Sequence, residues 1–125
     1  MDKGRVLLID DDRTFLEETK ALLTEAGYEV STCCNAVAFL HMIRVHKPSC
    51  VVLDINMPGL RGTEILTWIY RQKFDLRVIV CSGVDFDEDE FGNAHPFAIL
   101  KKPFDIPDFI QKIDFAIDQP HKKAA

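Results

Sequence analysis

The chain has 125 residues, 47% of them hydrophobic, and a formal net charge of −5. This length suits one domain with a sizeable core, and the acidic balance argues against a nucleic-acid-binding surface. The one short apolar run near the start, at residues 6–9, leads directly into an aspartate, so we expect no signal peptide, no membrane span and a cytoplasmic protein.

The first half of the chain predicts two strand–helix pairs. Residues 5–9 form an apolar strand, and Asp12 can cap a helix from 13 to about 26 that stops at Gly27. Residues 28–32 alternate polar and apolar, which suits an edge strand, and a second helix begins after Asn35 and ends at Lys47-Pro48. The faces expected to point into the core carry Phe15, Thr19, Leu22, Leu23 and Ala26 on the first helix, and Phe39, Met42, Ile43 and His46 on the second.

The second half is arranged around the apolar run at 50–54. A strand that is apolar on both faces is typical of the centre of a parallel sheet, and this one ends in Asp54 shortly before a turn at Pro58-Gly59. A helix from about Gly62 and strands at 77–81 and 97–100 follow, and the last helix is capped by Asp105 and stopped by Pro120. The apolar faces of these two helices carry Ile65, Leu66, Trp68 and Ile69, and Ile106, Phe109, Ile110, Ile113 and Ile117.

Strands and helices alternate five times, which predicts an α/β fold with a doubly wound parallel sheet. The weakest segment is 84–96, where Phe86 and Phe91 are the large apolar residues of an otherwise acidic stretch, so we expect a short or mobile helix there. Its acidic run at 85–90 is more typical of a solvated face than of a metal site. We expect one domain over 1–118, with a disordered tail or the start of a linker at 119–125.

The four cysteines, Cys33, Cys34, Cys50 and Cys81, form no CxxC pair. Cys50 and Cys81 lie in apolar strands, so buried thiols in a reducing compartment are favoured over a metal or redox site.

Polar side chains follow the predicted strands at the points where the strands end. Asp10 and Asp11 come after the first strand, Asp54 ends the third, and Ser82 and Lys102 follow the last two. The carboxyl ends of parallel strands meet at one edge of a sheet, where open α/β domains bind ligands. Close carboxylates repel one another unless a cation lies among them, and their hard oxygen atoms suit Mg²⁺.

This set of groups also matches the needs of phosphoryl transfer. A carboxylate beside a bound Mg²⁺ can act as the nucleophile and form an aspartyl phosphate, while Lys102 and Ser82 stabilise the oxygens of the transferred group. Taken singly, each residue has a structural interpretation: Asp11 or Asp12 can cap the first helix, Asp54 and Ser82 can belong to turns, and Lys102 can be a surface lysine. Their convergence on one edge favours the chemical interpretation.

The sequence resembles the receiver domains of two-component response regulators. The matching segments are Leu7-Leu8-Ile9-Asp10-Asp11-Asp12, residues 51–62 around Asp54, Val78-Ile79-Val80-Cys81-Ser82-Gly83 and Lys102-Pro103-Phe104. The resemblance covers residues from about 3 to 118. It implies a three-layer, flavodoxin-like α/β fold with a five-stranded parallel sheet in the order 2-1-3-4-5.

The resemblance also implies roles for the strand-end residues. Asp54 would take a phosphoryl group from a sensor histidine kinase or phosphotransfer protein, and Asp10, Asp11 and Asp54, with the backbone carbonyl of Asn56, would hold Mg²⁺. Ser82 would be the switch hydroxyl, and Lys102 would pair with the phosphoryl group. The Lys102-Pro103 peptide would be cis. The family is a signalling domain and not an enzyme in the usual sense, and it acts on a downstream partner or output domain.

Two features depart from the family pattern. Ile99 stands where the family usually has an aromatic residue that swings inward on activation, and the span from Ser82 to Lys102 is about two residues short. We therefore expect a non-standard output.

Two other functions compete with the phospho-accepting receiver. One is a receiver-like binding module that does not depend on phosphorylation. The other is a small haloacid-dehalogenase-like phosphatase with its nucleophile at Asp10-Asp11-Asp12, but Arg13-Thr14 does not continue that motif and Asp54 is left unexplained. Substitution distinguishes them, because Asp54→Asn should inactivate the receiver and Asp10→Asn the phosphatase.

Overall fold

The computed structural model describes residues 3–55, 62–72, 74, 76–83 and 96–118. Five parallel strands form one sheet in the order β2-β1-β3-β4-β5, which confirms the predicted fold class and strand order. The strands are β1 (Arg5–Ile9), β2 (Glu29–Cys33), β3 (Cys50–Asp54), β4 (Arg77–Ser82) and β5 (Ala98–Lys101). The helices are α1 (Arg13–Glu25), α2 (Ala36–His46), α3 (Gly62–Gln72) and α4 (Ile106–Asp118).

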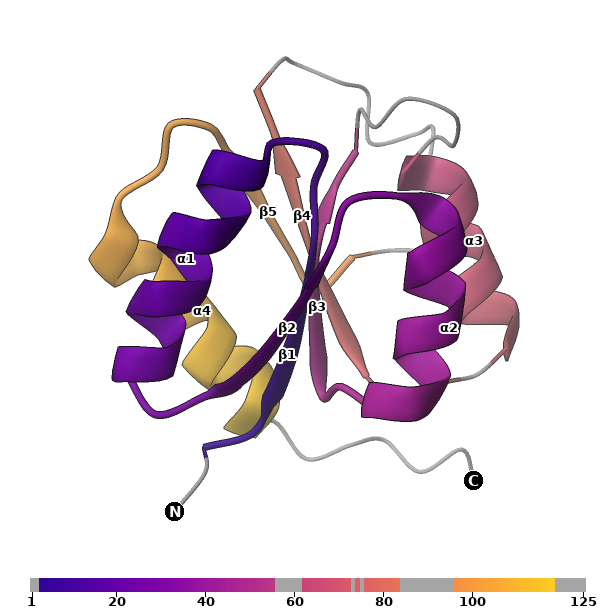
Figure 1. The fold of residues 1–125 in the computed structure, drawn as a ribbon, viewed down its shortest axis with the longest axis horizontal. Coiled ribbons are helices and arrows are strands. Elements are labelled where there is room, and N and C mark those ends of the chain that lie inside the picture. The colour runs from indigo at the N-terminus through magenta and orange to yellow at the C-terminus, as the bar shows by residue number, and fades with distance from the viewer. Residues whose placement is uncertain (1–2, 56–61, 73, 75, 84–95, 119–125) are drawn as a thin grey trace.

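The helices lie on both faces of the sheet and make three layers, with α1 and α4 on one face and α2 and α3 on the other (Figure 1). Alternate residues of the buried strands point into the two spaces between the sheet and its helices. Leu53 of β3 packs with Phe39 of α2 and Ile65 of α3, whereas Val52 packs with Leu23 of α1 and Phe109 of α4. The sheet therefore separates two half-cores.

Local sequence signals set the ends of the first two helices. The Asp12 carboxylate accepts a hydrogen bond from the Phe15 N–H at 3.1 Å, and Asn35 Oδ1 accepts one from Ala38 N–H at 2.8 Å. Past the C-terminus of α1, Gly27 adopts a φ of +106°, which is strained for a residue with a side chain. Lys47 ends α2 in the left-handed conformation with φ +52°.

The structure corrects details of four predicted elements. On α1 the buried residues are Leu16, Thr19 and Leu23, whereas Leu22 is 38% exposed. β2 begins at Glu29 and not at Tyr28, because the Tyr28 N–H donates to the carbonyl of Leu23 and not to a neighbouring strand. β4 extends one residue further than predicted, to Ser82, and β5 is shifted by one residue, to Ala98–Lys101. Residues 84–95, which make up nearly all of the segment where a helix was expected, lie outside the described residues.

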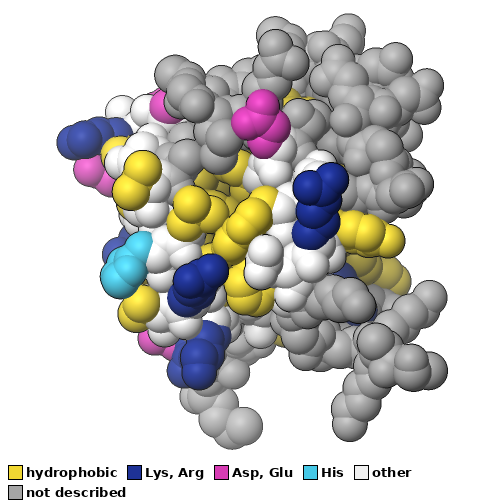
Figure 2. All heavy atoms as spheres, turned by 90° about the vertical axis from the view of Figure 1, so that its right-hand side faces the viewer, with side chains coloured by type: hydrophobic (Ala, Val, Ile, Leu, Met, Phe, Trp, Pro, Cys, Tyr) yellow, Lys and Arg dark blue, Asp and Glu magenta, His cyan; other side chains and the backbone are white. Residues whose placement is uncertain are grey.

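Apolar side chains also gather on the outer surface of α2 and α3 (Figure 2). Val37 and Val45 of α2 are 81% and 63% exposed, and Tyr70 of α3 is 59% exposed. Among the described residues, none of the helices is long and apolar enough to cross a membrane.

Candidate functional site

The predicted site residues that the structure describes meet at the carboxyl edge of the sheet. Asp10 directly follows β1, Asp54 ends β3 and Ser82 ends β4. Lys102 follows β5, and its N–H donates to the Ser82 carbonyl at 2.7 Å. Because the strands are parallel and β3 and β4 pair in register from Cys50 to Asp54, the strand ends bring these side chains together.

Three carboxylates form the centre of the site. One oxygen each from Asp10, Asp11 and Asp54 lies within 4.8 Å of the other two. Asp10 is 2% and Asp54 8% exposed, whereas Asp11 lies on the solvent side. Asp12 is not part of the cluster, because its carboxylate caps α1 and its N–H donates to Asp10 Oδ1 at 3.0 Å. The capping role that the sequence left open between Asp11 and Asp12 therefore belongs to Asp12.

The Lys102 ammonium compensates part of this negative charge. It forms an ion pair with Asp10 and lies 4.0 Å from Asp54 Oδ2, and its side chain is 23% exposed. Burial opposes the charged form, but the hydrogen bond to Asp10 and the charges of Asp10 and Asp54 outweigh it, so the pKa of Lys102 is raised. The lysine is therefore a fixed cation at neutral pH. Its peptide bond to Pro103 is cis.

Cys81 and Ser82 are the last two residues of β4, and both are buried. Burial raises the pKa of the Cys81 thiol to about 12, with Lys102 lowering it and the charges of Asp10 and Asp54 raising it further. This thiol is therefore protonated at neutral pH, as expected of a structural cysteine and not of a reactive one. Asn56, predicted as a metal ligand, lies outside the described residues.

Phe15 is a site neighbour that the sequence predictions missed. It was assigned to the core face of α1, but its half-buried ring lies with its centroid 4.3 Å from Lys102 Nζ. The available signal was its position, since a residue in the first turn of α1 must lie near the edge where β1 ends.

The carboxylate cluster fits a small divalent cation. Ligand oxygens around Mg²⁺ lie about 3 to 4 Å apart, so only a small contraction or a bridging water separates this cluster from a metal site. The donor set consists of hard oxygens, which Mg²⁺ prefers. Because Asp11 is exposed, a metal ion can reach the cluster from solvent.

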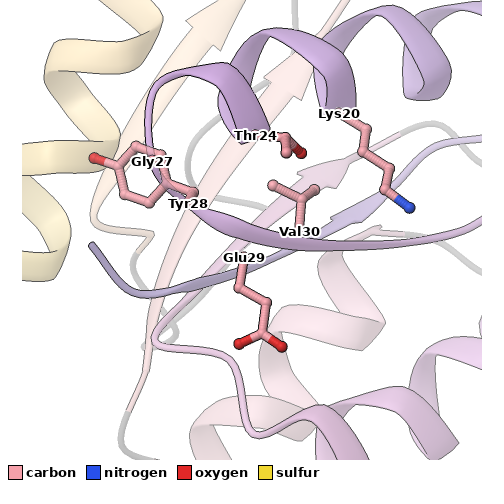
Figure 3. Close-up of a pocket in the computed structure, with 6 residues that line it drawn as sticks. All are labelled: Lys20, Thr24, Gly27, Tyr28, Glu29 and Val30. Carbon is pink, nitrogen blue, oxygen red and sulfur yellow. The ribbon is translucent and has the colours of Figure 1, made fainter. Parts of the chain in front are cut away.

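A pocket of about 500 Å³ lies elsewhere, beside α1 and the start of β2 (Figure 3). Its lining includes Lys20 and Thr24 of α1 and Val30 of β2. Since Gly27 and Tyr28 of its lining precede β2, it lies toward the opposite edge of the sheet from the carboxylates and is not part of the candidate site.

Comparisons with known proteins identify the family. Residues 6–114 match the response regulator receiver domain family. The transcriptional regulatory protein PrrA of Mycobacterium tuberculosis is 31% identical over 119 residues, which cover 90% of this chain and 51% of that protein. The response regulator MprA of Mycobacterium sp. (strain KMS) is 30% identical over 111 residues, 87% of this chain and 48% of that protein. The chain thus spans about half the length of these curated relatives.

Solved structures give the same result. A CheY-like response regulator receiver domain from Methanospirillum hungatei JF-1 aligns with a TM-score of 0.85 and 30% identity, over 91% of this chain and 93% of that one. A receiver domain from Clostridium thermocellum aligns with a TM-score of 0.82 and 28% identity, over 92% of this chain and 94% of that one. With its fold, its strand-end carboxylates and these matches, the chain belongs to the response regulator receiver domain family, the signalling domains of two-component systems.

Proposed function

We propose that this domain accepts a phosphoryl group on Asp54 in a Mg²⁺-dependent reaction and thereby changes its interaction with a downstream protein or output domain. The observation that carries the proposal is the placement of Asp54. Its nearly buried carboxylate ends the central strand, shares a cluster with Asp10 and Asp11, and lies 4.0 Å from the Lys102 ammonium.

The step follows from these groups. An Asp54 oxygen forms a bond to phosphorus while the bond between phosphorus and the donor's histidine nitrogen breaks, and the electron pair of that bond leaves with the imidazole. Lys102 lies beside the position that the negative oxygens of the transferred group would take, and its ammonium keeps its proton throughout the step. When bound by Asp10, Asp11 and Asp54, Mg²⁺ would neutralise further charge on the same oxygens. The Ser82 hydroxyl would donate a hydrogen bond to one of them.

The donor would be a sensor histidine kinase or a phosphotransfer protein of a phosphorelay in the cytoplasm. Residues 1–118 would form the receiver unit, with 119–125 as a tail or the start of a linker. Nothing in the acidic composition favours direct binding of nucleic acid by this domain.

Ile99 supports a non-standard output. It lies on β5 and packs against the half-core beneath α2 and α3. An aliphatic side chain at this position offers no ring to swing inward, so the response would depend on Ser82 and Lys102. Structures with and without beryllofluoride test this, and ordinary inward movement of Ser82 with full reordering of 84–96 would contradict it.

The direct test of acceptance is intact-mass spectrometry after incubation with acetyl phosphate and Mg²⁺. One added phosphoryl group is expected on the native chain and on Asp118→Asn, a control at the exposed end of α4. None is expected on Asp54→Asn or without Mg²⁺. Unmodified native protein that also fails to bind beryllofluoride would refute the proposal and favour a binding module independent of phosphorylation.

A further inference from the structure

The Lys102 ammonium contacts a charged group and an aromatic ring. It pairs with Asp10, and it lies over the Phe15 ring, 4.3 Å from the ring centroid. An ammonium this close to an aromatic ring is attracted by the negative charge of the ring face, most strongly where water is partly excluded. The lysine side chain is 23% exposed, so the attraction acts in a partly desolvated place.

The Phe15 ring is held in place by two further rings. It meets Phe104 edge to face, with centroids 6.0 Å apart and an interplanar angle of 83°. Phe104 in turn packs on Phe109, with centroids 4.7 Å apart, and Phe109 is buried in the half-core beneath α4. Because the Phe15 ring is held by these contacts, it can restrict the position of the Lys102 ammonium that lies over it.

We propose that Phe15 is a positioning residue for phosphoryl transfer, whose ring acts with Asp10 to hold the Lys102 ammonium 4.0 Å from Asp54 Oδ2. This inference rests on the proposed function of Asp54. A lysine drawn into a close pair with Asp54 would withdraw charge from the attacking oxygen. A lysine held at 4.0 Å leaves that oxygen reactive and is already in place for the phosphoryl oxygens that arrive beside it.

Fluorination of the ring separates this role from packing. Replacement of Phe15 by trifluoro- and then pentafluorophenylalanine keeps a similar shape and progressively removes the negative charge of the ring face. With acetyl phosphate and saturating Mg²⁺, the initial rate of phosphorylation should fall in that order, by roughly fivefold for the pentafluoro ring. The same residues at Phe115, which is 59% exposed on α4, should leave the rate unchanged. Equal rates across the Phe15 series, in chains with native thermal unfolding, would refute the proposal.

A second measurement does not require phosphorylation. The ring current of Phe15 should shift the Lys102 ε-methylene protons upfield in the NMR spectrum, and this shift should vanish in Phe15→Leu but remain in Phe115→Leu. If the native chain accepts no phosphoryl group, the proposed function fails. If the native chain lacks the upfield shift of the Lys102 protons, the contact between Phe15 and Lys102 is refuted. If the adduct forms but the rates stay equal, the role of Phe15 fails while Asp54 remains the acceptor.

Discussion

Removing the charge of Asp11 should stabilise the metal-free domain and weaken its stabilisation by Mg²⁺. The substitution is Asp11→Asn, which keeps the shape of the side chain. Asp11 is the exposed member of the carboxylate cluster, and Lys102 pairs with Asp10 instead. The repulsion of Asp11 by Asp10 and Asp54 is therefore a cost that the metal-free protein carries.

The magnitude follows from the geometry. At 4.8 Å, the distance within which all three ligand oxygens lie, two negative charges repel by about 1 kcal/mol in water and by about 3.5 kcal/mol at an effective dielectric constant of 20. Since Asp11 is exposed, the lower figure applies to each pair, and lost attraction to Lys102 and to the N-terminus of α1 offsets part of the sum. The expected net stabilisation of Asp11→Asn is about 1 kcal/mol.

Mg²⁺ should make the native chain more stable than Asp11→Asn, the reverse of their order without metal. At ten times its dissociation constant, a ligand that binds only the folded state adds about 1.4 kcal/mol to the free energy of unfolding. The native chain should gain this increment, and Asp11→Asn should gain much less of it.

The assay is urea unfolding in EDTA and in Mg²⁺, followed by the fluorescence of Trp68, the single tryptophan of the chain. Trp68 is partly buried against Phe74, with ring centroids 5.4 Å apart. Asp118→Asn is the control for loss of one exposed carboxylate. An Asp11→Asn variant that is less stable than the native chain in EDTA, or that gains as much from Mg²⁺, would refute the reasoning.

Three more outcomes are expected. Lys102→Ala should lower the free energy of unfolding by about 1 to 2 kcal/mol in denaturant titrations, because the buried Asp10 carboxylate loses its cation. The variant should still bind Mg²⁺, but acetyl phosphate should phosphorylate it more slowly, as followed by intact-mass spectrometry. Burial is the largest cause that raises the pKa of the Cys33, Cys50 and Cys81 thiols from 9.0 to about 12. Stability should therefore be complete below pH 9 and fall by roughly 1 kcal/mol per thiol and pH unit above it, and Cys50→Ala should flatten this slope in urea titrations. Under native conditions a thiol reagent should modify Cys34, the one partly exposed cysteine, well before the other three, and simultaneous labelling of all four would contradict their burial.

Much of the fold could be predicted because its signals are local. The caps at Asp12 and Asn35 and the apolar run ending at Asp54 depend on neighbours in sequence, and each was predicted at its observed place. Parallel strands then bring Asp10, Asp54 and Lys102 to one edge whatever the details of packing.

What could not be predicted depends on how elements rotate against one another. Phe15 and Leu16 differ by about 100° around α1, and only the packed structure decides that Leu16 enters the core while Phe15 turns toward Lys102. The pairing of Lys102 with Asp10 has the same origin, because residues 92 positions apart in sequence give no local signal of which oxygen the ammonium meets.

The division of the interior by the sheet has a consequence for how the domain tolerates change. Substitutions within one half-core share neighbours, so Leu53→Ala and Ile65→Ala should show an interaction energy in a double-mutant cycle. Leu53 and Phe109 lie on opposite faces of the sheet and belong to different half-cores. The losses in the free energy of unfolding caused by Leu53→Ala and Phe109→Ala should therefore be additive. The packing on each face of the sheet can therefore vary independently of the other face, while the carboxyl ends of the strands, which carry the site residues, keep their positions.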